Sequence, residues 1–200
     1  HVSVYMLEVD EDSRLGREKL EGGTRYGAAD VPDDGMIVEL YEAARERLAR
    51  IGIPRYEISN FARPGWESRH NLKYWLWEPY VGLGADAHSF SGAMRWWKEG
   101  KSVRADEAEA IPEERILTGL RLERGVALTE AEQQRYADAI AFFERQGLLC
   151  WTGGRLRLTD QGVLVANEVM AAFLPDPALA EPQAGSLNYC EAVRLTIRTL

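Results

Sequence analysis

The chain has 200 residues, 46% hydrophobic and 28% charged, which is the composition of a folded globular protein rather than of a disordered or fibrous one. Its 24 basic residues against 32 acidic ones leave a net charge of -8, which argues against a general nucleic-acid-binding protein. Two cysteines, Cys150 and Cys190, cannot form a disulfide framework and are too few to hold an iron–sulfur cluster or a structural zinc ion, and no apolar run approaches the roughly 20 residues of a membrane span.

The amino-terminal segment is expected to form two strands joined through a helix. Residues 1–9 and the short run 56–59 are rich in β-branched and aromatic side chains, which favour strands. Between them, apolar residues recur every three or four positions from Met36 to Ile51, which is one face of a helix, and Gly52 follows as its cap. This order predicts a βαβ unit with parallel strands. Because two strands cannot form a stable parallel sheet, we expect partner strands before His1 or in another chain, and therefore a longer parent protein.

The segment from about residue 111 to 174 has a different pattern. Thr129 and Glu132 form a capping box before a helix, and Gly153-Gly154 is the signal of a tight hairpin turn. This order of elements is typical of a winged-helix-like domain. The expected elements are a helix over 112–122, a helix from 129 to about 146, hairpin strands over 148–151 and 155–158, and a helix over 159–173.

Winged-helix domains often bind DNA, but the charge of this one does not favour it. Residues 105–175 carry 12 acidic and 7 basic side chains, a net charge of -5. Few cations are therefore available to contact phosphates, and a protein partner fits better than DNA.

Residues 57–90 carry the richest chemistry. They hold His70 and His88, two of the three histidines, and residues 66–97 hold five of the six tryptophans. One interpretation is aromatic packing under a loop with one hydrogen-bonded histidine. The other is a site for a flat, apolar, anionic ligand, because aromatic side chains supply a wide contact area.

Basic residues and an imidazole in the same stretch indicate which class of ligand such a site would bind. Arg63, Arg69 and Lys73 can pair with carboxylates at the edge of a ligand, and a neutral imidazole can bind iron at its centre. A porphyrin meets all of these conditions.

Gly82, Gly84 and Ala87 match the spacing of a dinucleotide-binding fingerprint. No clear strand precedes this stretch and no good helix follows it, so the context is wrong for a nicotinamide or flavin site. We expect instead that Gly82 and Gly84 let the backbone turn close to another group.

The remaining reactive side chains give weak signals. Cys150 lies between apolar residues of the expected hairpin and is interpreted as a packed thiol, while Cys190 has no partner by spacing. Glu57, Glu67 and Asp86 are possible general acids or bases, but their spacing is irregular.

Three motifs resemble the HemW-type heme chaperones, which are grouped with radical SAM proteins related to oxygen-independent coproporphyrinogen III oxidase. They are Glu57-Ile-Ser-Asn-Phe-Ala-Arg-Pro-Gly65, Ser68-Arg-His-Asn-Leu-Lys-Tyr-Trp75 and Gly82-Leu-Gly-Ala-Asp-Ala-His-Ser89. Residues 114–122 and 156–162 are similar to the family's C-terminal winged-helix-like domain. The resemblance covers roughly residues 1–174.

The resemblance implies an α/β fold. Residues 1–104 would be the trailing strands and helix of a partial (β/α)6 radical SAM barrel with an aromatic heme-site loop, 105–175 a HemW/HemN-type winged-helix-like α+β domain, and 176–200 a linker and tail of unknown role. Similar proteins hold a 4Fe-4S cluster with a Cys-x3-Cys-x2-Cys motif, which this chain lacks, so the cluster is expected only in the parent. Glu8 and Tyr56 are the candidate positions near S-adenosylmethionine.

The His70-Asn71-x-x-Tyr74 sequence is similar to the heme-associated signature of the HemW-type proteins. The resemblance implies that His70 is the iron ligand or its neighbour, with Asn71 and Tyr74 orienting it. Arg69 and Lys73 complete the candidate heme site, and no catalytic residue is assigned.

Three functions follow as hypotheses. The first is the C-terminal part of a heme chaperone, which passes heme to a membrane or respiratory acceptor protein. The second is a fragment of a coproporphyrinogen oxidase of porphyrin biosynthesis, which leaves enzymatic activity open for the parent. The third is an acidic winged-helix interaction module without ligand. In each case we expect a cytoplasmic protein that neither crosses the membrane nor binds nucleic acid.

Overall fold

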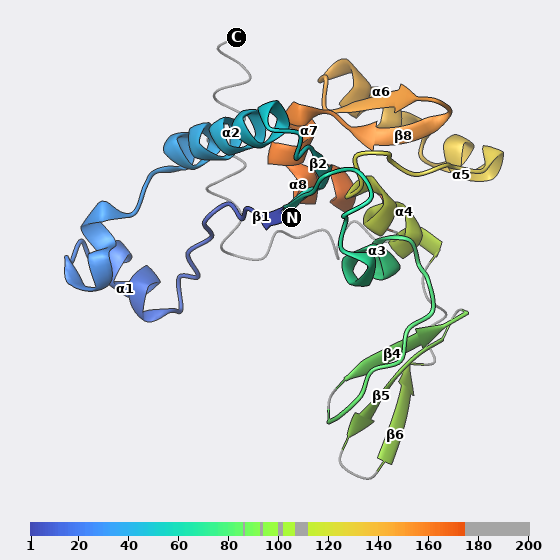
Figure 1. The fold of residues 1–200 in the computed structure, drawn as a ribbon, viewed down its shortest axis with the longest axis horizontal. Helices are drawn as coiled ribbons and strands as arrows, with labels where there is room; N and C mark the ends of the chain where they lie inside the picture. The colour runs from blue at the N-terminus through green and yellow to red at the C-terminus, as the bar shows by residue number, and fades with distance from the viewer. Residues whose placement is uncertain (86, 93, 100–101, 107–111, 175–200) are drawn as a thin grey trace.

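The structure is a computed structural model, and it describes residues 1–85, 87–92, 94–99, 102–106 and 112–174. It combines helices with small antiparallel sheets, which is consistent with an α/β class (Figure 1). Within these ranges, no helix has both the length and the apolar composition needed to cross a membrane.

The helices are α1 (Arg14–Leu20), the 3₁₀ helix η1 (Arg25–Asp30), α2 (Asp34–Arg50), α3 (Arg69–Trp75), α4 (Pro112–Leu120), α5 (Glu130–Arg135), α6 (Ala137–Arg145), α7 (Asp160–Leu164) and α8 (Ala166–Ala171). The strands are β1 (Val2–Ser3), β2 (Arg55–Glu57), β3 (Asn60–Phe61), β4 (His88–Ser91), β5 (Met94–Glu99), β6 (Ser102–Asp106), β7 (Leu149–Thr152) and β8 (Arg155–Leu158). We call residues 112–174 the C-terminal module and residues 66–80 the α3 region.

The first sheet has the order β1-β3-β2, and both outer strands are antiparallel to β3. The two expected strands therefore run in the same direction, but β3 lies between them, so the pairing of a simple βαβ unit is not formed. Only residues 58–59 separate β2 from β3, and the chain reverses there and fills the position beside both strands. The strand expected over 1–9 is much shorter, and beyond Val4, whose N–H donates to the Ser59 carbonyl at 2.8 Å, Tyr5 and Leu7 are exposed.

Helix α2 has the predicted ends. The Asp33 side chain accepts a hydrogen bond from the Met36 N–H at its start. At its end Gly52 has a φ of 77°, and its N–H donates to the Ala49 carbonyl at 3.0 Å while the Ile53 N–H donates to the Leu48 carbonyl. These two bonds form a Schellman motif, in which the left-handed glycine satisfies carbonyls at the end of the helix.

The buried face of α2 differs from the predicted one. Met36, Leu40 and Ile51 are exposed, whereas Tyr41 is buried. The Tyr41 hydroxyl donates to the Ile58 carbonyl at 2.7 Å, so this contact turns the Tyr41 face toward the sheet. Apolar spacing alone did not identify which side of the helix packs.

The C-terminal module confirms the predicted local signals. The capping box of Thr129 and Glu132 is formed. Gly153 and Gly154, with φ values of 56° and 73°, join β7 to β8. The helices expected after residues 129 and 159 are each broken in two, at Tyr136 and at Val165. The side chains of both residues are buried in the core.

The C-terminal module and the first sheet share one core. Residues 121–123 run beside β2, where the Ile58 N–H donates to the Arg121 carbonyl at 3.1 Å and the Glu123 N–H donates to the Tyr56 carbonyl at 3.0 Å. One buried cluster spans both parts, and its members include Tyr41, Ile58, Phe61, Ile116, Leu120, Tyr136, Ile140, Phe143, Leu156, Val169 and Phe173.

Strands β4, β5 and β6 form an antiparallel sheet that the sequence analysis missed. It extends away from the rest of the molecule, below α3 and α4 in the view of Figure 1. Arg95 connects it to α4 through Glu114, at 2.6 Å between Nη2 and Oε2. The aromatic run that contains Trp96 and Trp97 does not alternate with polar residues, so the usual signal of a half-buried strand was absent.

Candidate functional site

The predicted heme motif lies on α3, which is short and starts at a side-chain cap. The Ser68 hydroxyl accepts a hydrogen bond from the Asn71 N–H at 3.3 Å. His70 and Tyr74 are four residues apart and therefore share one face of the helix. The Tyr74 hydroxyl lies 3.3 Å from His70 Nε2, and the two rings meet edge to face with centroids 5.1 Å apart. The exposed imidazole of His70 thus has the Tyr74 hydroxyl as its hydrogen-bond partner.

The Tyr56 hydroxyl lies at the start of α3, next to the Asn71 side chain. The same hydroxyl accepts from the Ser68 N–H at 3.3 Å and lies 2.9 Å from His1 Nε2. Burial raises the pKa of Tyr56, and the hydrogen bonds from Ser68 and Asn71 act in the opposite direction. The Tyr56 hydroxyl therefore ties the start of α3 to β2.

Not all of the predicted basic residues are free to pair with a ligand carboxylate. Arg63 and Arg69 are exposed, on the loop before α3 and in its first turn. Lys73 instead lies 3.9 Å from the Glu78 carboxylate, and its ammonium donates to the Pro79 carbonyl at 3.4 Å. Arg63 and Arg69 are the better candidates for pairing with a ligand carboxylate.

A buried polar cluster, which the sequence analysis missed, holds the other side of α3. The Arg121 guanidinium lies over the Trp75 ring, 4.4 Å from its centroid, and 3.6 Å from the Glu57 carboxylate. Glu57 is 1% exposed, and its other carboxylate oxygen accepts from the Ser59 N–H and from the Asn60 amide. The Glu57 carboxylate, which the sequence analysis considered as a possible general acid or base, is therefore held inside the fold by an ion pair and hydrogen bonds. An acidic residue before a β-turn gave no sign of this partner 64 positions away in the sequence.

The other acid and thiol candidates are dispersed. Glu67 is partly buried in the loop before α3, and Cys150 is partly buried in β7. Asp86 and Cys190 lie outside the described residues. Within the described ranges, no group of three or more His, Cys, Asp or Glu side chains could hold a metal ion.

The glycine stretch is not a nucleotide site in this structure. The Gly82 N–H donates to the Ser89 hydroxyl at 3.0 Å, and the element that follows is the strand β4 rather than a helix. A Cβ at Gly82 would lie 2.3 Å from the His88 carbonyl, so the backbones approach too closely for a side chain. This confirms that the glycine serves a close backbone approach.

The two positions expected near S-adenosylmethionine have different surroundings. Glu8 is exposed in the irregular segment after β1. Tyr56 lies in β2, with its hydroxyl directed to α3 and its carbonyl accepting from Glu123. Tyr56 is thus tied to the heme motif.

Comparisons with known proteins show which families and relatives the chain is similar to. Residues 107–165 match the HemN C-terminal domain family. The chain is 34% identical to a heme chaperone HemW of Mycobacterium tuberculosis over 193 residues, which is 87% of this chain and 47% of that protein. It is 30% identical to the Bacillus subtilis heme chaperone HemW over 87% of this chain and 51% of that protein. The mouse radical S-adenosyl methionine domain-containing protein 1, mitochondrial, is 28% identical over 88% of this chain and 46% of its own length.

The chain spans about half the length of these curated relatives. No solved structure matches it. The matches confirm the resemblance drawn from the motifs: most of the chain is similar to heme chaperones HemW, and residues 107–165 match the HemN C-terminal domain family.

Proposed function

We propose, from this family likeness and from the geometry of α3, that the chain is the heme-binding part of a radical SAM family heme chaperone. The observation that carries the proposal is the exposed His70 imidazole held at Nε2 by the Tyr74 hydroxyl, 3.3 Å away. Metal-binding histidines generally donate their second ring N–H to a neighbouring acceptor, which fixes the tautomer. When Nε2–H donates to Tyr74, the lone pair of Nδ1 is left for the iron of heme.

The surroundings of α3 fit a planar anionic ligand. Trp66 is 74% exposed, and Arg63 and Arg69 carry exposed guanidinium groups near the start of the helix. An aromatic face and two cations offer stacking area and carboxylate partners to a porphyrin. The Tyr56 hydroxyl keeps the start of α3 in place while the ligand binds.

The proposal extends to the parent protein. Residues 1–104 would be closing elements of a (β/α)6 radical SAM barrel, residues 105–175 a winged-helix-like domain, and residues 176–200 a linker and tail. S-adenosylmethionine and a 4Fe-4S cluster would belong to the parent, near Glu8 and Tyr56 in the case of S-adenosylmethionine. Two cysteines cannot supply the ligands of the cluster, so no step of the function is assigned to it in this chain.

The physiological role would be delivery of heme to an acceptor in the membrane or the respiratory chain, from a cytoplasmic location. An exposed ligand site suits this role, because a carrier must both bind its cargo and let the acceptor reach it. A histidine on a surface helix meets that need better than a buried one.

A hemin titration tests the proposal. We expect the chain to give a shifted Soret band on binding hemin, and the His70→Ala variant to bind at least tenfold more weakly with a different band. His88→Ala is the matched control, because His88 is also exposed but lies on β4, stacked on Trp97 at 5.1 Å. An identical Soret band in the His70→Ala variant would remove His70 as the ligand.

A second candidate function is supported by the match of residues 107–165 to the HemN C-terminal domain. In this reading the parent oxidatively decarboxylates the propionate side chains of coproporphyrinogen. A full-length version, assayed anaerobically with S-adenosylmethionine, should then form protoporphyrinogen. Heme binding without that product would reject the oxidase function and retain the chaperone.

The third hypothesis, an interaction module without ligand, makes the opposite prediction. A ligand that binds only the folded state raises its stability. If neither hemin nor S-adenosylmethionine changes the melting temperature of the chain, the interaction module becomes the better explanation.

A further inference from the structure

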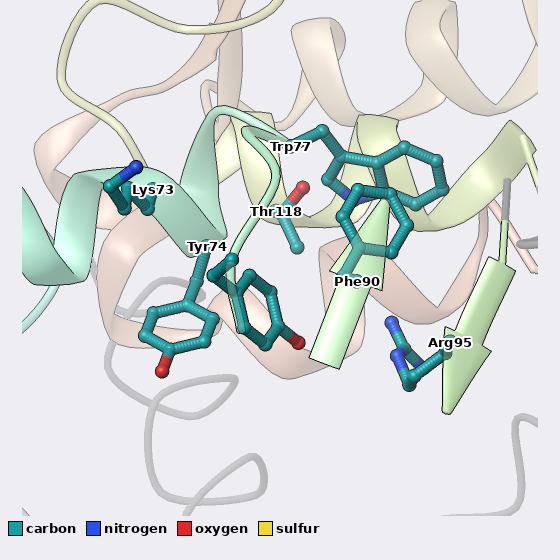
Figure 2. Close-up of a pocket in the computed structure, with 7 residues that line it drawn as sticks. Lys73, Tyr74, Trp77, Phe90, Arg95 and Thr118 are labelled. Carbon is teal, nitrogen blue, oxygen red and sulfur yellow. The ribbon is translucent and has the colours of Figure 1, made fainter. Parts of the chain in front are cut away.

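A small pocket lies beside Tyr74, between α3, the projecting sheet and α4 (Figure 2). Its volume is about 80 Å³. Four aromatic side chains form most of its wall, and their rings are in mutual contact: Tyr74 and Tyr80 at 4.6 Å between centroids, Tyr80 and Phe90 at 6.0 Å, and Trp77 and Phe90 at 5.0 Å.

The polar side chains of the pocket already have partners. Arg95 pairs with the Glu114 carboxylate at 2.6 Å, and the Lys73 ammonium lies 3.9 Å from the Glu78 carboxylate. The Thr118 hydroxyl donates to the Glu114 carbonyl at 2.8 Å. The positive charges are therefore balanced, and a carboxylate would have to displace one of these partners. An apolar group needs no such exchange.

The volume of the pocket also limits the size of the group that can enter it. An engineered apolar cavity of about 150 Å³ binds benzene. A pocket of about 80 Å³ is too small for a whole ring but has room for a substituent carried on a ring. The Tyr74 side chain both lines this pocket and contacts His70, so a planar ligand held at His70 would have its rim beside the pocket.

We propose that this pocket takes a vinyl group at the rim of the porphyrin whose iron His70 binds. The inference rests on the proposed function and adds to it a determinant of ligand choice. Tyr80 and Phe90 are the specificity-determining residues, since Phe90 lies on strand β4 of the projecting sheet, Tyr80 pairs with it through a β-bridge, and both rings line the pocket.

The test compares hemin with iron deuteroporphyrin, which carries hydrogen in place of both vinyl groups. The unsubstituted chain should bind hemin about tenfold more tightly, because burying the two carbons of one vinyl group contributes roughly 0.8 kcal/mol per carbon. The Phe90→Ala and Tyr80→Ala variants should lose most of this preference, to twofold or less. Phe142→Ala is the matched control, because Phe142 is 49% exposed and lies on α6, outside the pocket.

Two outcomes overturn the inference alone. Equal affinities for the two porphyrins in the unsubstituted chain, with a His70-dependent Soret band, reject the pocket but keep the heme site. A tenfold preference that persists in both pocket variants does the same. Loss of the His70-dependent band rejects the proposed function itself and the pocket with it. The measurement on the unsubstituted chain needs no variant, so a misfolded Phe90→Ala protein does not remove the test.

Discussion

The C-terminal module and the α3 region use aromatic side chains in opposite ways. In the module Tyr136, Phe143 and Phe173 are at most 7% exposed and belong to the shared core. In the α3 region Trp66 is 74% exposed and His70 lies at the surface. The hydrophobic effect explains the first group, because burial removes apolar area from water. It does not explain the exposed rings of the second group, for which the planar ligand proposed above would give a reason.

The largest loss of stability is expected from a substitution that leaves a cavity in the core of the C-terminal module. Phe173→Ala removes a fully buried ring, and a change of this kind costs about 3–5 kcal/mol. Urea unfolding should show this loss, and the α3 region should unfold in the same transition because its supporting sheet shares the core. Phe142→Ala is the control, since Phe142 is 49% exposed and should cost far less. A separate transition for the α3 region would contradict the shared core.

The next effect concerns the buried ion pair that supports α3. Arg121→Ala leaves the fully buried Glu57 carboxylate without its charge partner, which typically costs about 3 kcal/mol. It also removes the cation above Trp75, so we expect weaker hemin binding as well as lower stability. Arg124→Ala, three positions along the chain, serves as the control in both assays. Unaltered urea midpoints for Arg121→Ala would show that this pair does not stabilise the fold.

A smaller effect is the dependence of stability on pH, and it comes from Tyr136 in the C-terminal module. Burial, and then the hydrogen bond that its hydroxyl donates to Glu113 at 3.1 Å, raise the pKa of Tyr136 to about 12. The unfolded chain loses this proton near pH 10, its ordinary value. The stabilising contribution is therefore complete below pH 10 and is lost as the pH rises toward 12.

Melting temperatures between pH 9 and 11.5 measure this dependence. The Tyr136→Phe variant should lose less stability over that interval than the unsubstituted chain does. Tyr5→Phe should change nothing, because Tyr5 is 73% exposed. Equal slopes for the Tyr136→Phe variant and the unsubstituted chain would assign the alkaline transition to other groups, such as Tyr41, whose pKa burial also raises.

The smallest effect on stability is expected where the effect on binding is largest. His70→Ala changes an exposed residue, and such substitutions usually alter the free energy of unfolding by less than about 0.5 kcal/mol. The same variant should lose hemin binding. A stability loss of several kcal/mol would instead show that His70 supports the fold, and the contrast between the two regions would disappear.

Sequence reasoning succeeded where the determinants are local. Thr129, Glu132 and the Gly153-Gly154 turn act over a few residues, and the structure has each of them in its expected place. The contact between His70 and Tyr74 is also local, because residues four positions apart share one face of a helix, although only the family resemblance had pointed to this pair.

It failed where a partner lies far away along the chain. The position of β3 between β1 and β2 depends on a reversal over two residues, and no periodicity reports it. The Tyr56 hydroxyl accepts a hydrogen bond from the Ser68 N–H, 12 positions later, and no sequence pattern predicted this contact. Arg121 follows the end of α4, 46 positions after Trp75, so its contact with that ring could be recognised only in the three-dimensional fold.

The main-chain bonds between β2 and residues 121–123 have a consequence for how the protein can be divided. A truncation at residue 106 would remove the neighbour of Ile58 and leave an unpaired strand edge, a known template for aggregation. In hydrogen–deuterium exchange, the amide protons of Ile58 and Glu123 should therefore exchange at the same rate, through a single opening event. They should do so even though 65 positions separate them in the chain.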